Sequence, residues 1–221
     1  MRTVRWLLIV AFVVAAPCLV LQSASAEFFL DGYAGIALTN DADTTIDANG
    51  FSVVGTTKWK ESFVGGGRVG YWFDTVPWLG LALDASYFQP EEDVNTGPAK
   101  IEVLPISLLV MLRAPLITSP DFPRGRLQPY MGAGPGVFYT KFKLDLNPVG
   151  IPDTISETSW DIGLDLRAGV TFLFTRNIGV FAEYRLTYVN PEWEANVQGA
   201  TLTTDVELFT NHFVGGLTIR F

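Results

Sequence analysis

Any hydrolytic chemistry in this 221-residue chain would depend on His212, its single histidine. A hydrolase needs a nucleophilic hydroxyl and an orienting carboxylate within hydrogen-bond reach of the imidazole. Ser86 and Asp161 are predicted to lie at a similar level along the long axis of the fold as His212, but no sequence motif links the three residues. We therefore expect a hydrogen-bonded histidine without a catalytic role and predict that the protein is not an enzyme. An enzyme that acts at the outer rim of the fold is the third functional hypothesis, after the two given at the end of this subsection.

Acidic residues in the segment 39–62 raise the question of a calcium site, because carboxylates are preferred calcium ligands. Asp41 and Asp43 resemble the start of a calcium-binding loop. Counting from Asp41, Ile46 stands where the loop needs a glycine, and Ser52 where it needs a bidentate glutamate. We predict no metal site and no cofactor.

Charged residues occupy alternate positions in several segments. Within residues 160–174, Asp165 and Arg167 alternate with Leu164 and Leu166. A period of two is typical of a β-strand with two different faces. The same pattern predicts eight strands, at residues 28–38, 63–73, 79–88, 101–113, 130–142, 160–174, 178–188 and 213–221.

The charged faces of neighbouring strands complement each other. Counting across the predicted hairpins places three pairs of opposite sign together: Arg68 with Asp84, Arg167 with Glu183, and Asp165 with Arg185. An eight-stranded barrel has room only for side chains, so these charges are expected to plug it. The predicted lumen charge network is Arg68, Asp84, Asp161, Asp165, Arg167, Glu183, Arg185 and Arg220. The alternative is that the charges line a wet lumen and contribute little net free energy. Glycines on the inward face are expected to make room for the long arginine side chains.

The distribution of apolar residues distinguishes two kinds of barrel. A soluble ligand carrier is apolar inside, whereas a membrane barrel is apolar outside and polar inside. Here one face of each strand is nearly free of charge, and the other carries too many ions for a dry cavity. Aromatic residues gather toward the strand ends, as expected for two interfacial girdles. One predicted girdle is Tyr71, Trp72, Phe73, Trp78, Phe172, Phe174 and Phe221; the other is Tyr87, Phe88, Tyr139, Trp160, Tyr188 and Phe209.

The amino terminus is predicted to be a cleavable signal peptide, residues 1–26. Arg2 and Arg5 precede a 16-residue apolar run, which ends before the small residues Ala24 and Ala26. The run is shorter than the roughly 20 residues of a membrane-spanning helix. Residues 27–221 then form one domain with 13 basic and 23 acidic side chains and no cysteine. This composition argues against nucleic-acid binding and excludes disulfides.

Long and short connections alternate along the chain, as in barrels with long external loops and short periplasmic turns. Residues 39–62 form the largest predicted external loop, and residues 190–206 form another. The Pro-rich segment 114–129 is long where a short turn is expected. It is either a structured periplasmic loop or a sign that ten strands form instead of eight.

The chain resembles the small outer-membrane β-barrel proteins related to opacity proteins and to the transmembrane part of outer membrane protein A. The resemblance covers residues 27–221 and rests on the runs 66–72, 76–80 and 183–185 and on the terminal Phe221. It implies a location in the outer membrane of a Gram-negative bacterium, with both termini in the periplasm. It also implies an assembly signal, read by the barrel-assembly machinery, at Phe213, Leu217, Ile219 and Phe221. The chain ends with the barrel, so no peptidoglycan-binding domain is expected after it.

The sequence therefore predicts an all-β protein, an eight-stranded antiparallel up-and-down transmembrane β-barrel. Fold alone does not determine the role of such a barrel. The first hypothesis is a structural protein that contacts an extracellular ligand through acidic external loops. The second is a small, porin-like diffusion channel. Outer-membrane lipid and lipopolysaccharide are the expected surroundings of either.

Overall fold

The computed structural model describes residues 27–48, 51–91, 99–145, 154–197 and 200–221. Side chains are described throughout these ranges except at residues 42–57, 99, 144–145, 154–155, 193–197 and 200–205. The predicted signal peptide lies outside the described residues. No helix within them is long and apolar enough to cross a membrane.

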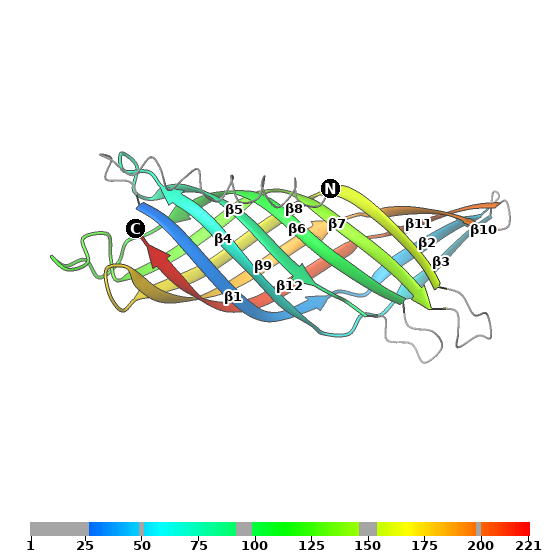
Figure 1. Ribbon diagram of the computed structural model, residues 1–221, viewed down its shortest axis with the longest axis horizontal. Helices are drawn as coiled ribbons and strands as arrows, with labels where there is room; N and C mark the ends of the chain where they lie inside the picture. Colours follow the sequence, from blue (N-terminus) through cyan, green and yellow to red (C-terminus); the bar gives the residue numbers. More distant parts are fainter. Residues whose placement is uncertain (1–26, 49–50, 92–98, 146–153, 198–199) are drawn as a thin grey trace, which may run out of the picture.

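Eight strands form a closed antiparallel barrel, which confirms the predicted fold and excludes the ten-stranded alternative (Figure 1). They are β1 (Glu27–Thr39), β4 (Ser62–Trp72), β5 (Leu79–Phe88), β6 (Ala99–Arg113), β7 (Leu127–Asp145), β8 (Thr154–Leu173), β9 (Ile178–Val189) and β12 (Leu208–Arg220). Each strand pairs with the barrel strand before and after it. The barrel closes because β1 pairs with β4 on one side and with β12 on the other.

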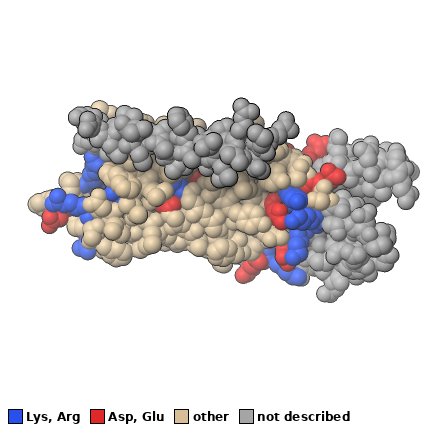
Figure 2. All heavy atoms as spheres, in the orientation of Figure 1, with Lys and Arg blue, Asp and Glu red and all other residues tan. Residues whose placement is uncertain are grey.

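The two faces of the wall follow the predicted alternation. In β12, Phe213, Leu217 and Ile219 are exposed on the outside, whereas Val214 and Thr218 are buried inside. On the face seen in Figure 2, the tan surface between the ends of the barrel is almost free of charge, and charged side chains gather toward the two ends. Such a surface suits the hydrocarbon core of a bilayer.

Two predicted girdle residues are misplaced. Trp72 and Phe88 lie at inward positions and are 3% and 1% exposed. They share the face of their strand with Gly70 and Ser86, so the period of two itself gives the correct orientation. The remaining outward aromatics still form contacts near both ends, for example Tyr139 with Trp160, whose rings lie 5.0 Å apart.

The inward face is less polar than the sequence suggests. Toward the outer end it carries a group of buried apolar side chains, which we call the outer apolar layer: Val64, Phe88, Ile101, Val103, Phe138, Val189 and Leu208. The inward face was expected to carry only charged residues and glycines, and this expectation is wrong for the outer half of the lumen. The barrel has a dry outer layer and an ionic middle.

A second sheet extends the barrel at the end opposite the carboxyl terminus (Figure 1). Its strands are β2 (Ala42–Ala48), β3 (Phe51–Thr57), β10 (Glu192–Val197) and β11 (Ala200–Val206), in the order β10-β11-β2-β3. The segments 39–62 and 190–206 were expected to be loops. They are instead two hairpins, which join where β2 pairs with β11.

The Pro-rich connection between β6 and β7 is a structured loop at the end of the barrel that holds Glu27 and the carboxyl terminus, the end expected to be periplasmic. Leu116 pairs with Leu127, and Gly125 has a left-handed backbone with a φ of 84°. Arg124 reaches from this loop to Glu27, the first residue of β1, at 3.1 Å. Of the two alternatives left open for this segment, a structured loop is the correct one, and ten strands do not form.

Inward glycines make room mostly for aromatic rings rather than for arginines. A Cβ added at Gly70 would collide with the ring of Phe29, and one at Gly169 with the ring of Tyr130. Gly132 is the described glycine that fits the expectation, because a Cβ there would crowd the stem of Arg167. The expectation is therefore corrected for most of these positions.

Candidate functional site

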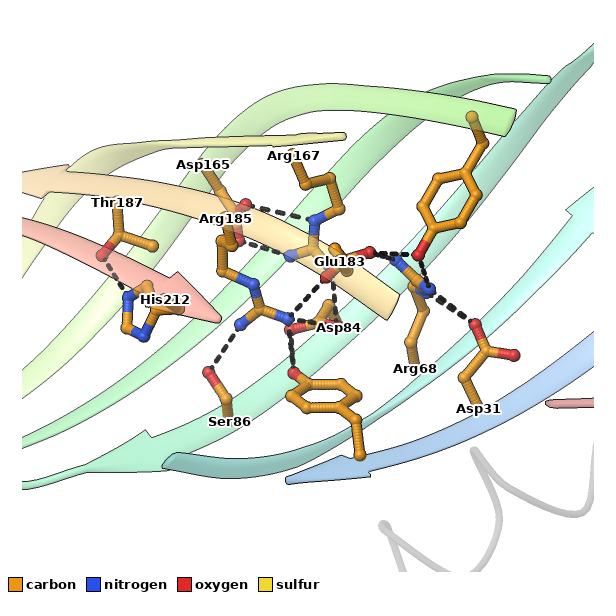
Figure 3. A network of polar contacts seen from close by, with 12 residues as sticks. Asp31, Arg68, Asp84, Ser86, Asp165, Arg167, Glu183, Arg185, Thr187 and His212 are labelled. Atoms are coloured by element: carbon orange, nitrogen blue, oxygen red, sulfur yellow. Dashed lines mark hydrogen bonds and ion pairs between the residues drawn. The ribbon is translucent and has the colours of Figure 1, made fainter. Parts of the chain in front are cut away.

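Seven charged side chains meet in the middle of the lumen (Figure 3). They come from β1, β4, β5, β8 and β9 because each occupies an inward position of its strand. This central cluster consists of Asp31, Arg68, Asp84, Asp165, Arg167, Glu183 and Arg185, each 4% exposed or less.

Arg68 connects two acids on strands that are separated by β12. Its guanidinium lies 2.7 Å from Asp31 of β1 and 2.7 Å from Glu183 of β9. The same group stacks over aromatic rings, 5.4 Å from Tyr130 and 5.3 Å from Phe181. Arg68 therefore spans the lumen and is held by both ion pairs and ring faces.

Arg167 and Arg185 are cross-strand neighbours on β8 and β9. Acids that contact both arginines offset the repulsion between the two positive charges. Arg167 lies 2.6 Å from Asp165 and 2.9 Å from Asp84. Arg185 lies 3.2 Å from the same Asp84 oxygen and 3.6 Å from Glu183. These shared acids place negative charge between two guanidinium groups.

Two tyrosines complete the cluster, and neither was predicted from the sequence to belong to it. Tyr130 donates a hydrogen bond of 2.7 Å to Glu183, and Tyr33 donates one of 2.8 Å to Asp84. Arg185 also donates to Tyr33 and to Ser86. Tyr33 follows Asp31 by two positions, so the same period of two could have identified it.

One of the three predicted pairs is observed, because Arg167 lies 3.4 Å from Glu183, and the other two differ from the observed contacts. Arg68 does face Asp84 in the register of β4 and β5, but its ion pairs are with Asp31 and Glu183. Asp165 pairs with Arg167 on its own strand rather than with Arg185. Long side chains in a narrow bore reach past their cross-strand neighbours, so register alone does not determine the pairs.

Two predicted members of the network lie away from the central cluster. Arg220 lies at the periplasmic end, where Glu27 pairs with Arg220 at 3.2 Å, with Arg113 at 2.6 Å and with Arg124 at 3.1 Å. Asp161 faces inward nearer the outer end, and its buried Oδ2 has no hydrogen-bond partner among the described residues. The lumen thus contains two ionic clusters, and the sequence predicted one.

His212 is fully buried in the outer half of the lumen. Its Nε2 lies 2.9 Å from the Thr187 hydroxyl, and Phe88 packs edge-on against its ring. The candidate nucleophile Ser86 instead accepts a hydrogen bond from Arg185. Within the described residues, this geometry offers His212 neither a serine nucleophile nor an orienting carboxylate.

No group of three or more His, Cys, Asp or Glu side chains in the described parts of the chain could hold a metal ion. The carboxylates of the central cluster are already engaged by arginines. The side chains of the acidic segment from Asp43 to Ser52 lie outside the description, so the absence of a calcium site there stays a prediction.

The residues of the predicted assembly signal share the outer face of the last strand. Phe213, Leu217, Ile219 and Phe221 are all between 41% and 64% exposed. This orientation follows from the period of two. Their role in assembly stays a prediction.

Comparison with known proteins identifies the family. The sequence profile of the outer membrane protein beta-barrel domain matches residues 10–221. No curated protein sequence matches the chain. The crystal structure of the outer membrane protein OprG from Pseudomonas aeruginosa is similar, with a TM-score of 0.60 and 18% identity over 90% of this chain and 97% of that one.

Two further solved structures are similar to the chain. Outer membrane protein AlkL, determined in DMPC bilayers, has a TM-score of 0.55 and 12% identity over 90% of this chain and 93% of that one. Neisserial surface protein A has a TM-score of 0.47 and 17% identity over 90% of this chain and 100% of that one. At these identities the likeness concerns the fold. The chain belongs to the outer membrane protein beta-barrel domain family and is an outer-membrane protein of the kind found in Gram-negative bacteria.

Proposed function

We propose that this protein is a closed, non-conducting barrel that presents its external β-sheet for contacts at the cell surface. The observation that carries the proposal is the burial of the whole central cluster. Seven ions from five strands fill the bore with no side chain more than 4% exposed. An eight-stranded barrel has no spare width beside them.

The external sheet supports the second half of the proposal. It combines the β2–β3 hairpin, from between β1 and β4, with the β10–β11 hairpin, from between β9 and β12. Pairing of β2 with β11 makes one body from two connections, which is more rigid than separate loops. Its edge strands, β3 and β10, carry backbone groups that could pair with a strand of a partner protein.

Single-channel recording in planar bilayers tests the closed bore. The mature barrel should insert without producing conductance steps, because ions would have to displace buried, paired charges. Insertion is verified separately by protease protection of the barrel. Stable, reproducible conductance steps from the inserted protein would contradict the proposal.

A small diffusion channel is the second candidate, favoured by interruptions in the wall beside β6. Pairing between β5 and β6 skips the positions opposite Pro105, and pairing between β6 and β7 skips those around Pro135. Proline lacks the N–H that a ladder needs. A channel for apolar molecules would need a lateral route through this part of the wall, between the outer apolar layer and the surrounding lipid.

Transfer of an apolar fluorescent probe into proteoliposomes separates the two functions. A closed scaffold predicts the same transfer rate with and without the protein. A rate that rises with the protein and falls when Pro135 is replaced by valine would support the channel instead. The valine restores the N–H and keeps an apolar side chain at the same position.

A further inference from the structure

Arginines gather at the end of the barrel where the carboxyl terminus lies (Figure 1). Among the described residues, the strand ends, turns and loop there carry five of them: Arg113, Arg124, Arg126, Arg176 and Arg220. The anions at the same end are Glu27, Asp74, Asp121 and the carboxylate of Phe221, the last residue. This end therefore has a small excess of positive charge, although residues 27–221 as a whole are acidic.

Glu27, the first residue of β1, is surrounded by three of these arginines. Its carboxylate lies 2.6 Å from Arg113, 3.1 Å from Arg124 and 3.2 Å from Arg220. Asp74 also contacts Arg124, at 3.2 Å, so two carboxylates face three guanidinium groups. Glu27, Arg113 and Arg220 are each only 5% exposed. A buried charge needs a partner, so this excess favours a further anion beside Glu27.

Arg220 also has a donor without an acceptor. Its Nη1 donates to Glu27 at 3.2 Å, whereas its buried Nε has no hydrogen-bond partner among the described residues. The backbone of Arg220 is fixed, because its N–H donates to the Asn177 carbonyl and its own carbonyl accepts from the Asn177 side-chain amide. A buried donor that stays unpaired is costly. An anionic acceptor on a ligand would satisfy both the donor and the excess charge.

A pocket of about 280 Å³ lies beside Arg220. Its charged lining contains Arg124 and Arg176 as well, together with the acids that pair with them, Glu27 and Asp121. Its apolar lining consists of Phe122, Pro123, Leu173 and Phe221. The volume is close to the lower limit of about 300 Å³ for typical small-ligand pockets. The pocket therefore suits one small group and not a long chain.

Arg176, in the turn between β8 and β9, is the exposed cation of the pocket. Its Nε donates to the Asp121 carbonyl and its Nη2 to the Asp121 carboxylate, both at 3.0 Å. The Arg176 side chain is 63% exposed, whereas Arg220 is buried. A guanidinium group can donate two parallel hydrogen bonds to a carboxylate. The pocket thus offers an entering carboxylate one accessible cation and one buried cation.

The loop between β6 and β7 forms a preformed wall of the pocket. The Gln128 side chain donates to the carbonyls of Arg124 and Gly125 at 3.0 and 2.9 Å. Arg126 donates to the Leu173 carbonyl, and its guanidinium group lies 5.3 Å from the ring centre of Phe122. Binding to walls that are already ordered has a small entropic cost. This order favours a specific ligand over loose association with ions.

The lining also indicates what kind of anion fits. Cations beside apolar side chains suit a carboxylate that is attached to an apolar group. Asn177 adds an amide oxygen, which can accept a hydrogen bond from an N–H group. A peptide that ends in an apolar residue has all three features, namely a carboxylate, an apolar side chain and a backbone N–H. A fatty acid lacks the N–H, and acetate lacks the apolar group.

We propose that this pocket binds the free carboxyl end of a peptide in the compartment at this end of the barrel, which is expected to be the periplasm. The carboxylate lies between Arg176 and Arg220, and the last side chain of the peptide lies against Phe122 and Leu173. The site is at the end opposite the external sheet. It therefore does not depend on the contacts proposed for that sheet.

Isothermal titration calorimetry of the full mature barrel in phosphatidylcholine nanodiscs tests the proposal, with acetyl-glycyl-leucine as the probe. The same peptide with an amidated carboxyl end lacks the charge, and acetate and octanoate are the other comparison ligands. The test variants are Arg176→Gln, at an exposed position, and Arg220→Lys, which keeps a cation beside Glu27 but has no Nε. Lys58→Gln removes an exposed charge at the opposite end of the barrel and is the control.

Wild type and Lys58→Gln should bind acetyl-glycyl-leucine equally. Arg176→Gln and Arg220→Lys should each bind it at least about tenfold more weakly, because a charge-assisted hydrogen bond is lost. The amidated peptide, acetate and octanoate should each bind wild type at least about tenfold more weakly than the free peptide, for the same reason or for want of the apolar group or the N–H.

Heat-modifiable migration in gel electrophoresis verifies that each variant is folded. If Arg220→Lys does not fold, the exposed Arg176→Gln still decides. Absence of binding by wild type, or equal binding of the free peptide by wild type and Arg176→Gln, would overturn the proposal. Equal affinity of wild type for the amidated peptide would overturn it because the carboxylate would then be irrelevant. Equal affinity for octanoate would overturn it in favour of an acyl chain.

Discussion

At the scale of single residues, Glu183 is the acid on which the plug depends most. Its carboxylate contacts Arg68 at 2.7 Å, Arg167 at 3.4 Å and Arg185 at 3.6 Å and accepts a hydrogen bond from Tyr130. Glu183→Gln removes the charge and leaves guanidinium groups buried with less compensation. We expect the free energy of unfolding to fall by about 3–5 kcal/mol, measured by urea titration in lipid vesicles. Glu207→Gln, at an exposed position outside the lumen, should leave it unchanged.

Coupling between Arg167 and Glu183 distinguishes a plug from a wet lumen. We expect Arg167→Met combined with Glu183→Gln to cost less than the sum of the two single changes, by about 1–3 kcal/mol. The reason is that each partner, left alone, is an uncompensated buried ion. If the double variant lost as much free energy of unfolding as the two single variants together, water would already screen these charges.

Two glycines of β1 provide a matched test of close strand approach. A Cβ at Gly35 would fall on the backbone carbonyl oxygen of Phe213 in β12, whereas one at Gly32 would have open space around it. We expect Gly35→Ala to lower the free energy of unfolding by about 1–3 kcal/mol. Gly32→Ala should be neutral or slightly stabilising. Equal effects of the two substitutions on the urea midpoint would contradict this packing of β1 against β12.

At the scale of elements, the periplasmic loop between β6 and β7 contains a strained residue. Ile117 is a β-branched residue with a φ of 55°, and it is 63% exposed. Little burial is lost on replacing it, and glycine adopts this φ without strain. We expect Ile117→Gly to raise the thermal midpoint of unfolding, while Leu116→Gly, next to it and also exposed, should not. A lower midpoint for Ile117→Gly would show that burial outweighs backbone strain there.

The β2–β3 hairpin should be dispensable for the barrel. β1 pairs directly with β4 up to Ala37 and Ser62, so the wall is complete without the segment between them. Replacing residues 42–57 by a short glycine-serine turn should preserve the heat-modifiable migration of a folded barrel in gel electrophoresis. Under the proposed function, surface binding should be lost. Failure of the shortened chain to fold would show that the external sheet stabilises the wall.

The strands and their faces could be predicted from sequence, but the external sheet could not. A barrel strand has one face in lipid and one in the lumen. Apolar and polar residues therefore alternate along it with a period of two. The segments 39–62 and 190–206 contain only short stretches of such alternation, for example residues 192–197, which are shorter than a strand that crosses a bilayer. Their strands come from pairing between two distant hairpins, which no local pattern records.

The membership of the central cluster was largely predictable, whereas only one of the three predicted contacts, Arg167 with Glu183, is present. Inward position follows from alternation, so six of its seven residues are also in the predicted network, which omitted Asp31. Which oxygen meets which guanidinium depends on side-chain length and on rings such as Tyr33 and Tyr130 that redirect them. No sequence pattern predicts those contacts.

At the scale of the whole molecule, the protein is organised in layers along its axis. From the periplasm outward these are an arginine-rich end, the central cluster, the outer apolar layer and the external sheet. The lipid-facing wall remains apolar across the belt in Figure 2. The central claim is that this wall separates lipid from a lumen filled by its own side chains.

Cysteine labelling at two adjacent wall positions tests that claim most directly, because residues 27–221 contain no cysteine. Ala85 points outward, and Ser86 is buried in the lumen beside Arg185. In folded barrels in vesicles, Ala85→Cys should react with a lipid-soluble maleimide only. Ser86→Cys should react with neither a lipid-soluble nor a water-soluble maleimide until the protein is unfolded in urea. Rapid reaction of Ser86→Cys with the water-soluble reagent in the folded barrel would contradict the account.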